Sequence, residues 1–211
     1  MTLDGSDNVW LSDVGRHQIF KFTHDGRLLL TIGERRVPGW DGTHFNEPAD
    51  VAVLKDGSFY VSDGYENSRV AHFKADGSFL NEWGAKGNAP GQFLIPHGVT
   101  TDTRGRVYVA DRQNSRLQVF DSNGKFLRAW PVVPRTGRIF DVAVSPSGRI
   151  YLASTDGSDA VVVLDADFNQ VGHIPFDSTR IISSHQIAVQ GDTVIYLADT
   201  GGKRILKYVH R

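Results

Sequence analysis

Two histidines in this sequence have the side-chain type and the placement of metal ligands. His97 and His185 occur in comparable short segments, each just before an apolar β-type run. Neutral imidazole is a common zinc ligand, and open catalytic zinc sites usually take three protein ligands. The pair therefore predicts part of a zinc site. The alternative is that both rings only form hydrogen bonds inside the fold.

Tyr65 and Arg112 are the second pair of candidates, because they follow Asp63 and Asp111 at equivalent places. A tyrosine can act as a general base when a nearby cation or metal lowers its pKa. An arginine can bind a carboxylate through two parallel hydrogen bonds. Arg112 does not recur in the other repeats, which makes it a better candidate for ligand contact than the arginines that do. The recurring arginines are expected to pair with Asp63, Asp111 and Asp199 within the repeats: Arg69, Arg116 and Arg204.

The elements that must position these side chains are short strands. Between Ile95 and Trp130, turns containing Gly105 and Asn123-Gly124 separate runs rich in Val, Tyr, Phe, Leu and Thr. Such runs bounded by glycine and asparagine are typical of antiparallel hairpins. The predicted strands are His97–Thr101, Arg106–Asp111, Arg116–Asp121 and Lys125–Trp130. One sheet of four short strands buries too little apolar surface to be stable alone, so it needs copies of itself.

The copies are visible as a four-residue pattern of the type Tyr-Val-Ala-Asp. Its last positions are spaced by 50, 48, 43 and 45 residues: Asp13, Asp63, Asp111, Ser154 and Asp199. This period is typical of four-stranded propeller blades. The sequence therefore predicts an all-β fold, a single β-propeller domain over residues 1–211 with about five repeats. The expected repeats span about 1–33, 48–84, 95–130, 139–174 and 182–211.

The first strand of a propeller blade lies nearest the axis, so the residues that open it can converge on the channel mouth. In four repeats these residues are Ala49, His97, Phe140 and His185. The first repeat shows only the tail of such a strand, and the last shows three strands. We therefore expect either a ring that closes imperfectly or an open arc whose edges pair with another copy.

Composition excludes some classes of function. The 211 residues include 23 basic and 24 acidic side chains, so nothing favours binding to nucleic acid or an anionic membrane. No apolar run approaches the roughly 20 residues needed to cross a bilayer, and no signal peptide is recognisable. The absence of cysteine excludes disulfides and thiolate metal sites. It fits both a cytoplasmic protein and a bacterial secreted one, so the compartment stays open.

Three segments carry a resemblance to known proteins: SDGYENSR at residues 62–69, GQFLIPH at 91–97 and ADRQNSR at 110–116. The repeat resembles the NHL family. More closely, these segments resemble the lyase domain of peptidylglycine α-amidating enzymes. That resemblance implies a six-bladed propeller that cleaves a peptidyl-α-hydroxyglycine into a peptide amide and glyoxylate at a zinc held by three histidines.

The resemblance also implies roles for single residues. His97 and His185 would be two of the zinc ligands, and the third family histidine falls upstream of Met1. Tyr65 would deprotonate the substrate hydroxyl, and Arg112 would help to hold the substrate. The family places a calcium-associated acidic residue after its last zinc histidine. This chain has Gln186 there, so calcium is not expected at that position. The resemblance thus implies zinc as the cofactor.

A second interpretation is a non-catalytic NHL propeller that binds a protein or carbohydrate partner. It predicts no bound metal, and binding that does not change when Tyr65 is replaced. An RNA-binding NHL module would need a basic face, which the net charge of −1 disfavours. On the first interpretation the partner is a small peptide or similar hydroxyglycine substrate.

Overall fold

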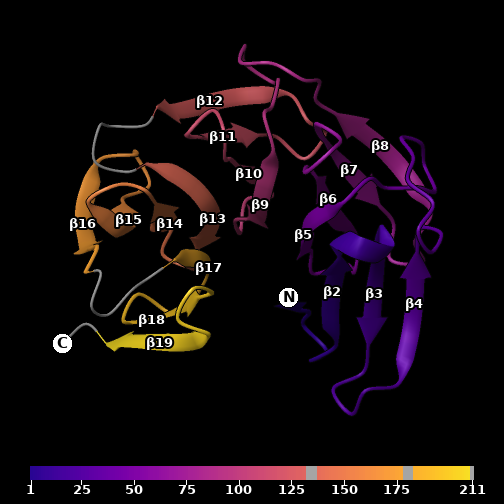
Figure 1. Ribbon diagram of the computed structural model, residues 1–211, viewed down its shortest axis with the longest axis horizontal. Coiled ribbons are helices and arrows are strands. Elements are labelled where there is room, and N and C mark those ends of the chain that lie inside the picture. Colours follow the sequence, from indigo (N-terminus) through magenta and orange to yellow (C-terminus); the bar gives the residue numbers. More distant parts are fainter. Residues whose placement is uncertain (132–136, 178–182, 210–211) are drawn as a thin grey trace.

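The computed structural model describes residues 1–131, 137–177 and 183–209. These residues form five antiparallel sheets, which follow one another around an arc with the first and last sheets at its two ends (Figure 1). The only helical element among them is a single 3₁₀ turn, η1 (Val14–Arg16). The fold is an all-β propeller of five blades, as the repeat period predicts. Whether its edges pair with another copy stays a prediction.

The first two blades are four-stranded sheets with their strands in sequence order. The first holds β1 (Thr2–Leu3), β2 (Val9–Asp13), β3 (Gln18–Phe22) and β4 (Leu28–Ile32). The second holds β5 (Pro48–Val53), β6 (Phe59–Asp63), β7 (Arg69–Phe73) and β8 (Phe79–Trp83). The strand β1 is only two residues long, which agrees with the strand tail expected at the start of the sequence.

The third blade contains the four strands expected there, each within a residue or two of its predicted bounds: β9 (Pro96–Thr101), β10 (Val107–Asp111), β11 (Arg116–Phe120) and β12 (Phe126–Pro131). The fourth blade holds β13 (Arg138–Val144), β14 (Ile150–Thr155), β15 (Asp159–Leu164) and β16 (Gln170–Pro175). The fifth sheet has three strands in the described part of the chain, β17 (Ser184–Gln190), β18 (Val194–Asp199) and β19 (Arg204–Val209). Its predicted limits, residues 182 and 211, lie outside the described residues.

The blades pack face to face, and large apolar side chains fill the space between them. Between the first two blades, Trp10, Phe45, Phe59 and Phe73 are fully buried in one cluster. The ring centroids of Phe59 and Phe73 lie 5.2 Å apart. Comparable clusters fill the other blade boundaries. Each blade is therefore stabilised mainly by its neighbours, as in other repeat folds.

Ion pairs inside the blades hold the connecting loops in place. Asp63 pairs with Arg69 at 2.9 Å, Asp111 with Arg116 at 2.8 Å and Asp199 with Arg204 at 3.0 Å, which confirms the three predicted pairs. In the second and third blades the arginine also donates to carbonyl oxygens of the preceding connector. The fourth blade has Ser154 instead of the aspartate. There the first residue of β15, Asp159, pairs with His173 at 2.8 Å.

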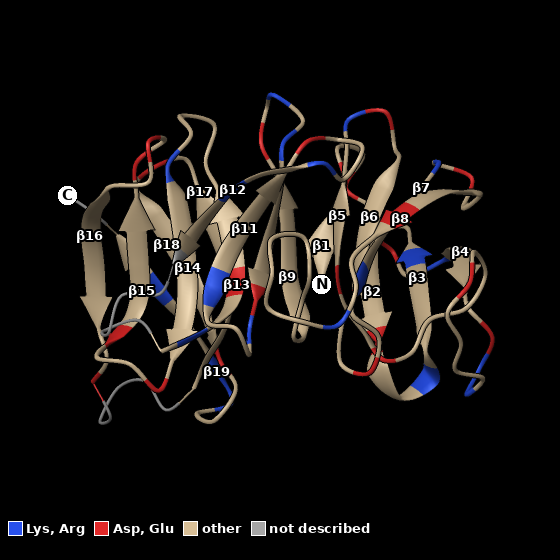
Figure 2. Cartoon of the chain, turned by 90° about the horizontal axis from the view of Figure 1, so that it is seen from above, with Lys and Arg blue, Asp and Glu red and all other residues tan. Residues whose placement is uncertain are grey.

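Charged side chains of both signs are interspersed along the loops and strand ends (Figure 2). None of the described residues belongs to a helix long and apolar enough to cross a membrane.

Candidate active site at the mouth of the channel

The inner strands share a register shift near their first residues, and the candidate side chains lie within it. In β5, β9, β13 and β17 the pairing with the second strand shifts register near the start of the strand. The residues within these shifts include Ala49, His97, Phe140 and His185, which are the four residues predicted to open the inner strands. A β-bulge re-aims the side chain of the residue that loses its ladder position. The same irregularity thus brings His97, Phe140 and His185 into mutual contact.

His97 lies at the centre of this group and is only 3% exposed. Its Nδ1 lies 2.7 Å from the carbonyl oxygen of Phe140. A carbonyl can only accept, so Nδ1 carries a proton that it donates to the next blade. Burial, His185 and the positive charge of Arg112 lower the pKa of His97 to about 3. The ring is therefore neutral at pH 7, and its Nε2 has a free lone pair.

That lone pair meets Tyr65. The hydroxyl oxygen of Tyr65 lies 2.9 Å from Nε2 of His97, so the phenol donates and the imidazole accepts. The two rings meet edge to face, with centroids 5.3 Å apart. The sequence placed these residues in different blades, and the structure brings them into direct contact.

The backbone of Gly64 makes this contact possible. A Cβ atom at Gly64 would lie 1.8 Å from the carbonyl oxygen of Pro96, so only glycine lets the loop after β6 approach the third blade this closely. The same loops show that Tyr65 and Arg112 are equivalent, as predicted. The amide of Tyr65 donates to the carbonyl of Glu47 at 3.3 Å, and that of Arg112 to the carbonyl of Ile95 at 3.0 Å.

Arg112 lies against two aromatic rings of the site. Its guanidinium carbon is 5.4 Å from the ring centroid of Tyr65 and 4.7 Å from that of Phe140. Its Nε is buried and has no hydrogen-bond partner among the described residues. An unpaired buried N–H is costly, so this group favours an anionic or carbonyl acceptor from a ligand.

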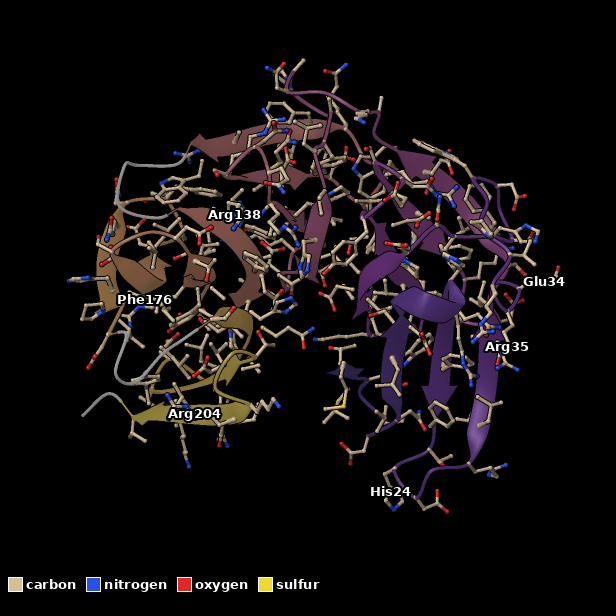
Figure 3. The ribbon with its side chains drawn as sticks, viewed as in Figure 1. His24, Glu34, Arg35, Arg138, Phe176 and Arg204 are labelled. Carbon is tan, nitrogen blue, oxygen red and sulfur yellow. The ribbon has the colours of Figure 1, made fainter. Side chains whose placement is uncertain are left out.

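Phe140 is the residue whose role sequence reasoning missed. Its ring lies within 5.3 Å of His97 and 5.0 Å of His185, measured between centroids. Arg138, the first residue of β13, also lies near this ring (Figure 3). Its guanidinium carbon is 5.9 Å from the centroid of Phe140. The repeat pattern placed Phe140 at the same position as the two histidines, and that shared position was the available signal. Its ring thus lies against both imidazoles and against the guanidinium of Arg112.

His185 completes the group described here. Its ring centroid is 4.8 Å from that of His97, with the planes 75° apart. Burial and the charge of Arg112 lower the pKa of His185, so a neutral imidazole is favoured here too. Two neutral imidazoles in contact are suitable donors for zinc. In the described part of the chain, no three His, Cys, Asp or Glu side chains group as a metal site. The residues present therefore fit two of the three positions of a catalytic zinc site.

Two aspartates lie directly after the bulge positions, in the channel. Asp50 accepts from the amide of Val99 at 3.1 Å, and Asp141 accepts from the amide of Ile187 at 2.9 Å. Both line a cavity of about 410 Å³ between the inner strands. Burial raises the pKa of both carboxyls, and the charge of Asp50 raises that of Asp141 further. The two side chains thus link adjacent inner strands, β5 to β9 and β13 to β17, through hydrogen bonds.

Comparison with known proteins shows which families this chain is similar to. The family model described as the NHL repeat matches residues 45–73 and 93–120, which cover most of the second and third blades. Two of the five blades of this β-propeller thus contain a match to the NHL repeat. Over nearly its whole length its sequence relatives include peptidyl-α-hydroxyglycine α-amidating lyases, peptidylglycine α-amidating monooxygenases and NHL repeat-containing protein 3.

Three relatives illustrate this. A probable peptidyl-α-hydroxyglycine α-amidating lyase of Caenorhabditis elegans is 31% identical, covering 98% of this chain and 62% of its own length. Peptidyl-α-hydroxyglycine α-amidating lyase 1 of Drosophila melanogaster is 34% identical, covering 100% of this chain and 44% of its own length. Human NHL repeat-containing protein 3 is 33% identical over 96% of this chain and 62% of its own. The chain thus spans less than two thirds of each relative.

Solved structures support the fold alone. Virginiamycin B lyase from Staphylococcus aureus superposes with a TM-score of 0.72, at 13% sequence identity, covering all of this chain and 65% of the solved one.

Proposed function

We propose that this chain forms the catalytic propeller of a peptidyl-α-hydroxyglycine α-amidating lyase. The observation that carries the proposal is the contact of the Tyr65 hydroxyl with Nε2 of His97, beside His185 and beneath Arg112. The named relatives support the reaction class. In this reaction the substrate hydroxyl loses its proton, a carbonyl forms at the same carbon, and the bond from that carbon to the amide nitrogen breaks. The nitrogen gains a proton, which gives a peptide amide and glyoxylate.

Each residue of the site would have its own role in this reaction. His97 and His185 would hold zinc, which would supply Lewis-acid polarisation of the substrate hydroxyl when bound. Tyr65 would accept the proton of that hydroxyl, a role in which its oxygen must first lose its own proton. Arg112 would bind the carboxylate of the hydroxyglycine unit through its free Nε–H. Phe140 would keep water away from the reacting carbon on the side of β13.

A non-catalytic propeller is the second candidate. It is favoured by the likeness to human NHL repeat-containing protein 3 and by the two-histidine donor set in the described residues. Two ligands bind zinc more weakly than three, and such a chain would serve as a binding scaffold.

The test is zinc content together with glyoxylate release from a synthetic α-hydroxyglycine peptide. Wild type, His97→Ala and His185→Ala are compared with His173→Ala, which changes a half-exposed histidine of the fourth blade. We expect wild type and His173→Ala to bind zinc and release glyoxylate, and both site variants to lose zinc. Absence of both zinc and glyoxylate from the wild type would contradict the proposal and favour the scaffold.

Arg112 gives a second line of evidence. Its replacement by leucine should lower kcat/KM about 10- to 100-fold on a substrate with a free carboxylate, since a charged hydrogen bond contributes about 1.5–3 kcal/mol. On the matching methyl ester the same variant should behave more like wild type. Equal losses on acid and ester would argue against carboxylate binding by Arg112.

A further inference from the structure

Serine hydroxyls connect neighbouring blades at two equivalent places. Ser12 Oγ of β2 donates to the carbonyl oxygen of Ala49 at 2.8 Å, and Ser62 Oγ of β6 donates to that of His97 at 2.6 Å. Each serine precedes the last residue of a second strand. Each acceptor lies at the irregular start of the next inner strand. The two hydrogen bonds therefore join equivalent positions at successive blade boundaries.

The next boundary lacks this hydroxyl, because the equivalent residue of β10 is Ala110. Ala110 packs in the same buried cluster as Ile139 of β13. Here the carbonyl of the equivalent residue, Phe140, accepts from Nδ1 of His97 instead. The imidazole of His97 thus takes the place that a serine hydroxyl has at the two preceding boundaries.

His97 is consequently held from both sides. Its carbonyl is fixed by the second blade through Ser62, and its ring is fixed by the fourth blade through Phe140. The carbonyl of His97 lies where β9 loses its register with β10, between the pairs Val109–Val99 and Asp111–Pro96. A buried carbonyl that is out of register needs another donor, and Ser62 is fully buried beside it.

We propose that Ser62 is a positioning residue for His97. Its hydroxyl fixes the backbone at the bulge, so that Nδ1–H reaches the Phe140 carbonyl and the Nε2 lone pair faces Tyr65. This inference deepens the proposed function, on which its meaning for metal binding rests. The acceptor of the other ring N–H of a metal-binding histidine, here the Phe140 carbonyl, typically changes metal affinity 10- to 100-fold when that bond is lost. Ser62 would act on the metal through this bond.

The test compares Ser62→Ala with Ser12→Ala, which removes the same kind of bond where the acceptor residue is Ala49 instead of a histidine. In protein labelled with ¹⁵N-histidine, the shifts of the two imidazole nitrogens report which one carries the proton, and His97→Gln identifies the signals of His97. Zinc affinity is measured by competition with a chelating dye. Urea unfolding measures the loss of stability that a merely structural hydroxyl would cause.

In wild type we expect His97 as a single tautomer, protonated at Nδ1. Ser62→Ala should show averaged signals from both tautomers and bind zinc about 10- to 100-fold more weakly. Ser12→Ala should lose comparable stability and leave both readouts unchanged. If Ser62→Ala keeps the wild-type His97 signals, the inference is wrong, and Ser62 only stabilises the blade boundary. If no protein binds zinc, the proposed function fails, while the imidazole signals still decide the role of Ser62.

Discussion

The hydroxyl of Tyr65 donates to Nε2 of His97 across 2.9 Å, which joins the loop after β6 to the inner strand of the third blade. The phenol occupies the lone pair that the histidine would offer to a metal. The proposed zinc binding would therefore compete with this hydrogen bond for one nitrogen. If His97 held a zinc ion as proposed, the Tyr65 hydroxyl would no longer donate to it and could take part in proton transfer.

Replacing Tyr65 by phenylalanine separates metal binding from proton transfer. Tyr65→Phe should retain zinc at least as well as wild type, since the competing hydroxyl is gone. Glyoxylate release should fall by about 100-fold or more, the usual effect of losing a general base. Metal analysis and single-turnover kinetics on the same samples check this. A variant with full activity would exclude Tyr65 as the base.

Gly64 should tolerate no side chain. In Gly64→Ala the new Cβ would overlap the Pro96 carbonyl, so the loop must move away from the third blade. We expect a loss of about 1–3 kcal/mol in the free energy of unfolding, typical of overpacking, together with loss of the Tyr65–His97 contact. Gly5→Ala is the control, because a Cβ there meets nothing within 4 Å. Equal stability of the two variants would show that the loop after β6 adapts freely.

The arginines that pair with the blade aspartates should contribute to the free energy of unfolding according to how deeply they are buried. The side chain of Arg69 is 0% exposed, and besides Asp63 it contacts Glu82 and two loop carbonyls. Arg69→Leu leaves a buried carboxylate without its cation, which costs about 3–5 kcal/mol. Arg204 lies on β19, the third strand of the last sheet (Figure 3), with its side chain 42% exposed. Arg204→Leu should therefore cost less in urea unfolding, and the reverse order would contradict this account.

The channel aspartate Asp141 should make stability depend on pH. Its pKa is raised in the folded protein by burial and by Asp50, whereas the unfolded chain has the ordinary value of 3.8. The folded state thus holds a proton to higher pH, so this group lowers stability as pH rises above about 4. Asp141→Asn removes the effect and should be more stable than wild type at pH 7, with a smaller difference at pH 4.

Asp76 provides a control of opposite sign for this experiment. Its pKa is lowered by hydrogen bonds from Ser78, so it contributes stability that is lost as pH falls through its folded pKa. Asp76→Asn should therefore be less stable than wild type at pH 7. Urea unfolding of the three proteins at pH 4, 5.5 and 7 measures both trends. If Asp141→Asn gains nothing at pH 7, its carboxyl is not destabilising in the folded state.

Much of the architecture could be predicted because it repeats. The period of the Tyr-Val-Ala-Asp pattern predicted the blades. The recurring Asp and Arg predicted the ion pairs Asp63–Arg69 and Asp111–Arg116. These features are local, since the paired residues belong to adjacent strands of one hairpin. The shared position of His97 and His185 likewise placed both at the start of inner strands.

The sequence alone therefore determined the blades, their internal ion pairs and the ring of residues that opens the inner strands. Only the tertiary structure decided which of these residues meet and which nitrogen of His97 carries a proton. The reason is that the decisive contacts cross blade boundaries. Ser62 bonds to a residue 35 positions away, and His97 to one 43 positions away. A repeat pattern shows that such positions are equivalent, but the way their side chains meet depends on how adjacent blades pack.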